Sequence, residues 1–171
     1  MNISFAKLME MDLIISRYFS SHNNPWLRGA LGALTYLGTG AVWITLYALA
    51  LIFLQDRFAQ LILTLILAEM IGLLTIIILR YMTKRKRPVI HYKYFSLTPW
   101  NRYSFPSHHT LRSFIIAVIV GTYSPGLLPF LLIMAATISF SRIYLSKHYL
   151  SDVLAGALLG ILLAMVSQRF I

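Results

Sequence analysis

The chain has 171 residues, of which 58% are apolar and 12% are charged. Soluble domains are roughly 45–50% apolar, and the mean hydropathy of +0.74 excludes a soluble globular protein and predicts an integral membrane protein. The absence of cysteine excludes disulfides and thiolate metal sites. The formal net charge of +10 would suggest nucleic acid in a soluble protein, but in a membrane protein it favours anionic lipid headgroups or a phosphorylated substrate.

The first segment, residues 1–24, mixes apolar side chains with charges and is too polar to span a membrane. We expect it to form an amphipathic helix that lies in the membrane interface. The same charges argue against a cleaved signal peptide, and Pro25 is placed to open the next helix. The four charged residues are Lys7, Glu10, Asp12 and Arg17.

Five apolar segments follow, and each is predicted to cross the membrane, because about 20 apolar residues suffice. They predict an all-α bundle that forms one domain over residues 1–171. With alternating directions, the polar junctions at the ends of these segments meet at one membrane face. The segments are residues 31–54, loosened at Gly38 to Gly40, then 58–79, 106–123, 126–145 and 150–166.

A polar junction between the last two segments, residues 141–152, carries candidate catalytic side chains. His148 and Asp152 are four residues apart, which would put them on one face of a helix. A carboxylate can accept from one imidazole nitrogen and leave the other free to attack. Arg142 offers a planar fork of donors that suits phosphate. The alternative is a solvated loop between two membrane helices.

A second cluster begins at Pro106, which is placed to start a helix. The free backbone N–H groups of Ser107, His108 and His109 would then form an anion site together with the serine hydroxyl. His109 could give a proton to a departing oxygen. A surface turn is the alternative. A metal site is less favoured, because the five histidines show no His-x-x-x-His or carboxylate-rich pattern.

A third cluster is basic and lies at residues 80–88. Arg80 and Arg87 are seven residues apart, two helical turns, and so share a face. Between them lie Lys84, Arg85 and Lys86. The alternative is a flanking basic patch that sets topology or touches anionic lipids.

Taken in order, the three clusters resemble the signature of the type 2 phosphatidic acid phosphatase (PAP2) superfamily. That signature is Lys-x6-Arg-Pro, then Pro-Ser-Gly-His, then Ser-Arg-x5-His-x3-Asp. The third element matches in full from Ser141 to Asp152. The second has His108 where glycine is usual, and the first has Arg80 where lysine is usual. The resemblance covers residues 80–152, and the flanking segments fit the membrane core of the family.

The resemblance implies roles for these residues. His148 is expected to be the nucleophile that forms a phosphohistidine, Asp152 to orient it, and His109 to protonate the leaving group. No cofactor and no catalytic metal are expected. The implied phosphate ligands are Arg80, Arg87, Ser107, His108 and Arg142. The ring of His108 either selects the headgroup or leaving group or simply points away.

The resemblance and the hydropathy together predict a membrane phosphatase acting on a lipid that enters between helices. Undecaprenyl diphosphate, phosphatidylglycerol phosphate, phosphatidate and lipid A phosphate remain open as substrates. Arg112, one turn after His109, and Lys86 are candidates for a headgroup or second phosphate. Glu69 lies in the middle of a span, where we expect a structural hydrogen bond. The alternative function is a non-catalytic anionic-lipid binder or small transporter.

The expected location is the inner cell membrane, where the lipid substrate and membrane lipids are the partners. Neither nucleic acid nor an obligatory protein partner is indicated. In this layout thirteen of the fifteen Lys and Arg lie toward the motif face, and only Arg57 and Arg169 lie at the other. The positive-inside rule would put that face in the cytoplasm. Resemblance to bacterial members favours the extracytoplasmic face, which we prefer because phosphate binding accounts for many of these cations.

Overall fold

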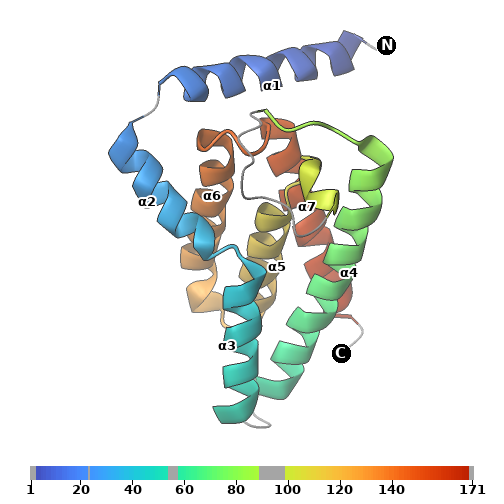
Figure 1. The fold of residues 1–171 in the computed structure, drawn as a ribbon. Coiled ribbons are helices and arrows are strands. Elements are labelled where there is room, and N and C mark those ends of the chain that lie inside the picture. The colour runs from blue at the N-terminus through green and yellow to red at the C-terminus, as the bar shows by residue number, and fades with distance from the viewer. Residues whose placement is uncertain (1–2, 23, 54–57, 89–98, 170–171) are drawn as a thin grey trace.

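A computed structural model describes residues 3–22, 24–53, 58–88 and 99–169. It confirms the predicted all-α bundle, with one helix lying across its end (Figure 1). The helices are α1 Ile3–Ser21, α2 Pro25–Tyr36, α3 Gly40–Phe53, α4 Ala59–Thr83, α5 His108–Tyr123, α6 Leu128–Tyr144 and α7 Leu150–Ser167, with short 3-10 turns η2 Pro99–Arg102 and η3 Pro125–Leu127.

The crossing helix, α1, packs against α6 and α7 with its polar side. Asp12 and Ser16 are buried, whereas apolar side chains such as Met11 and Ile14 are exposed. The exposed side also carries the charged residues Lys7, Glu10 and Arg17, but it differs from that of a helix on a water-soluble protein because most of its large side chains are apolar. A lipid interface would cover such a face, so the predicted interfacial position suits this helix.

The prediction of one continuous span over residues 31–54 is wrong. Asn24 Oδ1 caps α2 by accepting from the backbone N–H of Trp26, and Pro25 opens the helix as predicted. The helix ends at Tyr36, α3 begins at Gly40, and the two are bent by 42°. Glycine costs a helix about 1 kcal/mol relative to alanine, and two glycines flank this break.

The break between α2 and α3 is stabilised by side chains that satisfy freed carbonyls. Trp43 Nε1 donates to Leu37 O at 2.6 Å, and Thr39 Oγ1 donates to Tyr36 O at 2.7 Å. Gly38 lies where a side chain would not fit, since an added Cβ would be 2.9 Å from His109 Cδ2. The break is therefore a packed feature that brings backbone close to the second sequence motif.

Helix α5 lies at the centre, in contact with α4, α6 and α7. Leu111 and Ile115 of α5 are fully buried, as is Ile76 of α4. Glycines allow α7 to approach α5 closely, because a Cβ at Gly156 would lie 2.6 Å from Ser107 O and one at Gly160 would lie 2.5 Å from Leu111 O. This packing fixes the start of α5 against the start of α7.

Three helices of the described chain are long and apolar enough to cross a membrane: α4, the helical stretch Pro125–Tyr144 and α7. The bent α2–α3 pair makes a fourth if it is one span. Helix α5 has 16 residues and is the shortest of the predicted spans. The chain is thus a multi-pass membrane protein. The first of its five predicted spans is interrupted at residues 37–39, and α5 is not among the helices long enough to cross a membrane.

Candidate active site

The three sequence motifs meet at the end of the bundle that α1 covers (Figure 1). They come from the end of α4, the start of α5 and the α6–α7 connection, and they enclose a cavity of about 220 Å³. None of its described lining residues is acidic. Thr39, Gly40 and Asn101 complete a lining that otherwise consists of Arg80, Arg87, Arg112, Arg142, Lys147, His108, His109 and His148.

The His148–Asp152 pair forms, but not on one helix. Helix α7 begins at Leu150, so His148 precedes it, and the predicted shared helical face is wrong. His148 Nδ1 is 3.5 Å from Asp152 Oδ2, without hydrogen-bond geometry. That carboxylate oxygen also accepts from the backbone N–H of Tyr149 at 2.9 Å. Both side chains are almost fully buried, so the carboxylate is fixed behind the ring.

The other nitrogen of the ring faces the arginines. His148 Nε2 lies 3.0 Å from Arg87 Nη1, and a guanidinium can only donate, so Nε2 is the acceptor and the ring proton sits on Nδ1. Burial and the charges of Arg87, Arg142 and Arg80 hold the pKa of His148 well below its usual 6.5. A neutral imidazole with its Nε2 lone pair toward the cavity wall is the form that a nucleophile requires.

A tight turn positions His148 over Arg142. Ser146 adopts a left-handed conformation with φ of 52°, and Arg142 O accepts from the backbone N–H groups of Lys147 and His148 at 3.0 and 3.1 Å. Arg142 Nη1 donates to Thr35 Oγ1 of α2 at 2.9 Å. The sequence motifs gave no signal for Thr35, which lies far from them along the chain.

The start of α5 differs from prediction in two respects. The helix begins at His108, so the predicted start at Pro106 is wrong. Ser107 is its N-cap, and its backbone N–H donates to Asp152 O at 3.0 Å, so the predicted free N–H of Ser107 is wrong. Ser107 is fully buried and is absent from the cavity lining. The role of Ser107 as a phosphate ligand stays a prediction. His109, two residues later, does line the cavity.

The basic cluster divides between the cavity and the surface. Arg80 and Arg87 line the cavity and share Asn101, which accepts from Arg80 Nη1 through its side chain at 3.1 Å and from Arg87 Nε through its backbone at 3.0 Å. Lys86 is exposed and is absent from the lining. Arg85 instead bridges Asp12 and Asp152, each at 2.6 Å.

Arg112 has a partner that the sequence did not predict. Its Nε donates to Glu69 Oε2 at 2.9 Å, and Tyr47 OH donates to Glu69 Oε1 at 2.9 Å. Glu69 thus makes the hydrogen bonds inside the bundle that we expected. Arg112 still lines the cavity, as does His108, whose Nε2 is buried without a hydrogen-bond partner among the described residues.

The residues missed by sequence reasoning share a weak signal. The chain has only five acidic residues against fifteen basic ones. Each acid buried in a membrane protein is expected to pair with a cation or a hydrogen-bond donor. The spacing along the sequence does not show which residue that partner is. Asp12 reaches Arg85 and Glu69 reaches Arg112 over long sequence separations. In the part of the chain that the structure describes, His, Asp and Glu do not gather in groups of three or more that could hold a metal.

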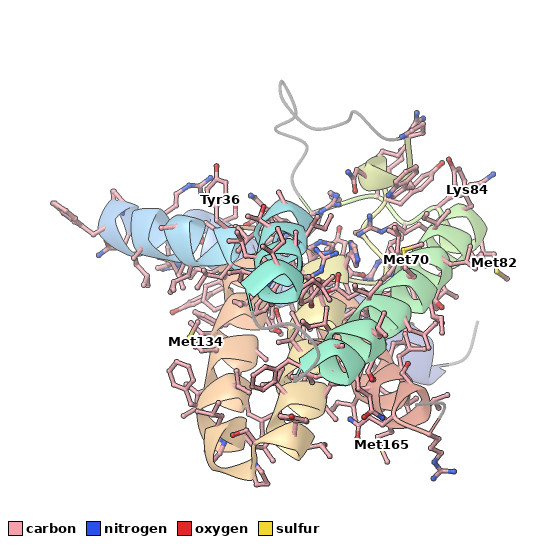
Figure 2. The ribbon with its side chains drawn as sticks, turned by 90° about the horizontal axis from the view of Figure 1, so that it is seen from below. Tyr36, Met70, Met82, Lys84, Met134 and Met165 are labelled. Atoms are coloured by element: carbon pink, nitrogen blue, oxygen red, sulfur yellow. The ribbon has the colours of Figure 1, made fainter. Side chains whose placement is uncertain are left out.

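A second cavity, the apolar cleft, has a volume of about 230 Å³ and lies between α3, α5 and α6. Met134 of α6 lines this cleft and lies across the bundle from Met70 and Met82 of α4, which do not line it (Figure 2). An added Cβ at Gly38 would be 2.9 Å from His109 and 3.1 Å from Ile138, so Gly38 separates the cleft from the catalytic cavity. The cleft is lined by Leu37, Val42, Trp43, Leu46, Ser113, Ile116, Ala117, Phe130, Leu131, Met134, Ala135 and Ile138.

A family model described as PAP2 superfamily matches residues 57–171, which contain all three motifs. The chain belongs to the PAP2 superfamily. The matched range covers α4 to α7 and leaves α1 to α3 outside it.

Relatives and solved structures agree with membership of the PAP2 superfamily. An undecaprenyl-diphosphatase from Sulfolobus acidocaldarius is 32% identical over 84% of this chain and 70% of its own length. Phosphatidylglycerophosphatase B from Bacillus subtilis is 25% identical over 93% of this chain and 82% of its own. The crystal structure of Aquifex aeolicus LpxE matches with a TM-score of 0.75 and 30% identity over 92% of this chain and 94% of that one.

Proposed function

We propose that this PAP2 protein is a lipid phosphate phosphatase that works through a phosphohistidine on His148. The observation that carries the proposal is a neutral, buried imidazole whose Nε2 lies 3.0 Å from Arg87 in an arginine-lined cavity. The relatives support the substrate class, since their names specify an undecaprenyl-diphosphatase and a phosphatidylglycerophosphatase.

In the first step His148 Nε2 attacks the terminal phosphorus, the N–P bond forms, and the bond from that phosphorus to the leaving oxygen breaks. The leaving oxygen belongs to the lipid alcohol in a monoester and to the lipid monophosphate in a diphosphate. His109 gives its proton to that departing oxygen. In the second step a water gives a proton back to His109 and attacks phosphorus, which releases inorganic phosphate and restores His148. Arg87 donates to His148 Nε2 in the free protein, so phosphate must draw that donor away before the lone pair can react.

The arginines stabilise negative charge on the phosphate oxygens during transfer. Arg80, Arg87 and Arg142 line the cavity from different elements and are held by Asn101 and Thr35. Preorganised donors of this kind are often the largest contribution to catalysis. Metal is unnecessary for this chemistry because the cations of the protein itself supply the charge, and we expect turnover in the presence of a chelator.

The apolar cleft supports a lipid substrate. Its lining is apolar apart from Ser113, and Gly38 lies close both to Ile138 of the cleft and to the ring of His109 in the catalytic cavity. An oxygen that leaves at His109 is therefore placed to carry a hydrocarbon chain toward the cleft. Burial of such a chain contributes roughly 0.8 kcal/mol per methylene, so the cleft favours long-chain lipids over soluble phosphate esters.

The decisive experiment measures phosphate release from purified protein in detergent with a chelator present. Undecaprenyl diphosphate, phosphatidylglycerol phosphate, phosphatidate and lipid A phosphate form the substrate panel. His148→Ala should lose at least ~10³-fold in turnover, because the nucleophile contributes no less than an acid–base group. A folded His148→Ala protein with wild-type turnover would overturn the mechanism. Lipid binding without any phosphate release would favour a non-catalytic binder.

We further propose that the end of the bundle that carries the catalytic cavity faces the extracytoplasmic side of the inner membrane. Because the chain has no cysteine, a single introduced cysteine gives a specific label. His22→Cys, at the exposed end of α1, should react with a membrane-impermeant maleimide in intact cells, whereas Arg169→Cys beyond α7 should not. The reverse labelling pattern would place the site in the cytoplasm.

A further inference from the structure

Arg85 connects the crossing helix to the catalytic carboxylate. Its Nη2 donates to Asp12 Oδ2 at 2.6 Å, and its Nη1 donates to Asp152 Oδ1 and to Ser151 Oγ, each at 2.6 Å. The guanidinium carbon lies 4.2 Å from the centre of the Tyr149 ring. One planar group is therefore fixed by two carboxylates, a hydroxyl and an aromatic face.

Asp12 also holds the first turn of α7. Its Oδ1 accepts from the backbone N–H of Ser151 at 3.0 Å, and its Oδ2 is hydrogen-bonded to Ser151 Oγ. The backbone N–H groups at the start of a helix lack partners within the helix, and a carboxylate there is favoured by the helix dipole. Asp12, from another helix, thus does for α7 what a local capping residue usually does.

The charges explain why both contacts matter to His148. Asp12 and Asp152 are 1% and 0% exposed, and a buried carboxylate without a cation is strongly disfavoured. Arg85 compensates both, and its charge favours the ionised form of Asp152. Asp152 Oδ1 accepts from Arg85, whereas Oδ2 accepts from Tyr149 N and lies 3.5 Å from His148 Nδ1. The orientation of Asp152 toward His148 is thus set in part by Arg85, which does not line the cavity.

We propose that α1 is part of the catalytic apparatus, with Asp12 and Arg85 as positioning residues that hold Asp152 against His148. The inference rests on the proposed role of His148 as nucleophile. It assigns a function to a helix outside the region matched by the family model, which begins at residue 57. Removal of either positioning residue should lower kcat and leave KM nearly unchanged, because neither lines the cavity where phosphate binds.

A double-mutant cycle tests the inference on phosphatidate in detergent micelles. Arg85→Lys should lower kcat roughly ten- to hundredfold, the typical effect of losing a charge-assisted hydrogen bond, and Asp12→Asn should lower it by less. In an Asp152→Asn background, either change should have less than about a threefold further effect, because residues that act through one group are not additive. Glu10→Gln, on the exposed side of α1, is the matched control and should equal wild type.

Each result separates the inference from the proposed function. Multiplicative losses from Arg85→Lys and Asp152→Asn would show that Arg85 acts independently of Asp152 and would overturn the inference. Wild-type kcat in Asp12→Asn and Arg85→Lys, with His148→Ala inactive, would overturn the inference alone. An active His148→Ala protein would remove both. Thermal unfolding in detergent identifies a variant that has simply lost its fold, and Asp12→Asn, which keeps the size of the side chain, serves if Arg85→Lys unfolds.

Discussion

The catalytic cavity and the apolar cleft have nearly the same volume, about 220 and 230 Å³, and each has a lining residue beside Gly38, yet they have opposite chemistry. The cavity is lined by four arginines, a lysine and three histidines, whereas the cleft is apolar apart from one serine. Charge-assisted hydrogen bonds are directional and fix one geometry. Apolar burial is non-directional and scales with area. We therefore expect the proposed lipid phosphate to be held precisely at its phosphate and loosely along its hydrocarbon chain.

This difference predicts two kinds of variant. Changes in the cavity should have effects that do not depend on the hydrocarbon chain of the lipid phosphate. Changes in the cleft should affect the preference among chains and leave the chemical step alone. The four predictions that follow run from the largest expected effect to the smallest, and each can break this division.

His109→Ala should lower kcat by roughly 10²- to 10⁴-fold for all chain lengths, because it removes the proposed general acid. The loss should shrink for a 4-nitrophenyl phosphate ester, whose leaving group needs no proton. Rates on both kinds of ester, with the exposed His22→Ala as control, provide the measurement. An equal loss on the activated ester would assign His109 to phosphate binding instead.

Arg112 tests whether the cavity holds a second phosphate. Arg112→Ala alone would leave Glu69 buried without its cation, which is strongly destabilising, so the informative variant is Arg112→Gln combined with Glu69→Gln. We expect this protein to fold and its KM for a diphosphate lipid to rise roughly ten- to hundredfold, with little change for a monophosphate lipid. Equal changes for both lipids would leave Arg112 a structural partner of Glu69.

Met134→Trp should fill part of the cleft and lower kcat/KM for a long-chain lipid phosphate by about tenfold, the loss of one to two buried methylenes. A short-chain analogue should be hydrolysed as by wild type. Ile133→Trp is the matched control, since Ile133 is 66% exposed and does not line the cleft. Chain-independent loss in Met134→Trp would show that the cleft does not bind the substrate chain.

Lys147 should give the cavity a weak alkaline limb. Burial and the charges of Arg142 and Arg87 lower the pKa of Lys147 to about 8, so the side chain is charged below that pH and loses its charge above it. kcat/KM, which reports the free enzyme, should fall a few-fold as pH rises through about 8. Lys147→Arg stays protonated and should flatten this limb, whereas an unchanged limb would exclude Lys147 as its source.

The sequence predicted the catalytic cavity better than the rest of the molecule, for a physical reason. His148, Asp152 and Arg142 lie in one turn and the helix ends beside it, so spacing along the chain carries their arrangement. Arg87 lies beyond the end of α4, so the predicted helical face shared with Arg80 is wrong, and long-range contacts to Lys147 and His148 hold it. The sequence indicated a loosened point at Gly38 to Gly40, but the full α2–α3 break was not predicted, because apolar residues fill both sides of it. The hydrogen bonds of Trp43 and Thr39 and the packing of Gly38 against His109 explain why it stays.

Hydrogen bonds between residues far apart in the sequence were the other feature that the sequence did not predict. Asp12 to Arg85, Thr35 to Arg142 and Glu69 to Arg112 each join residues from different helices, and hydropathy says only that such side chains need partners. The predicted helical pairing of His148 with Asp152 was wrong about the element, since α7 starts after His148, although the two residues do meet. The spacing along the sequence identified the right residues, but His148 precedes α7 and Asp152 lies in its first turn, in place of the predicted single helix.

The Tyr47–Glu69–Arg112 chain of hydrogen bonds bears on how the protein enters the bilayer. Glu69 belongs to α4 and Arg112 to α5, and a lone charge at membrane depth is costly. Because α4 is synthesised before α5, Glu69 can form its hydrogen bond with Tyr47 of α3 before Arg112, which neutralises its charge, has been synthesised. We therefore expect α4 and α5 to enter the bilayer from the insertion machinery as a pair. The basic segment that connects them has to be long enough for the two helices to pair.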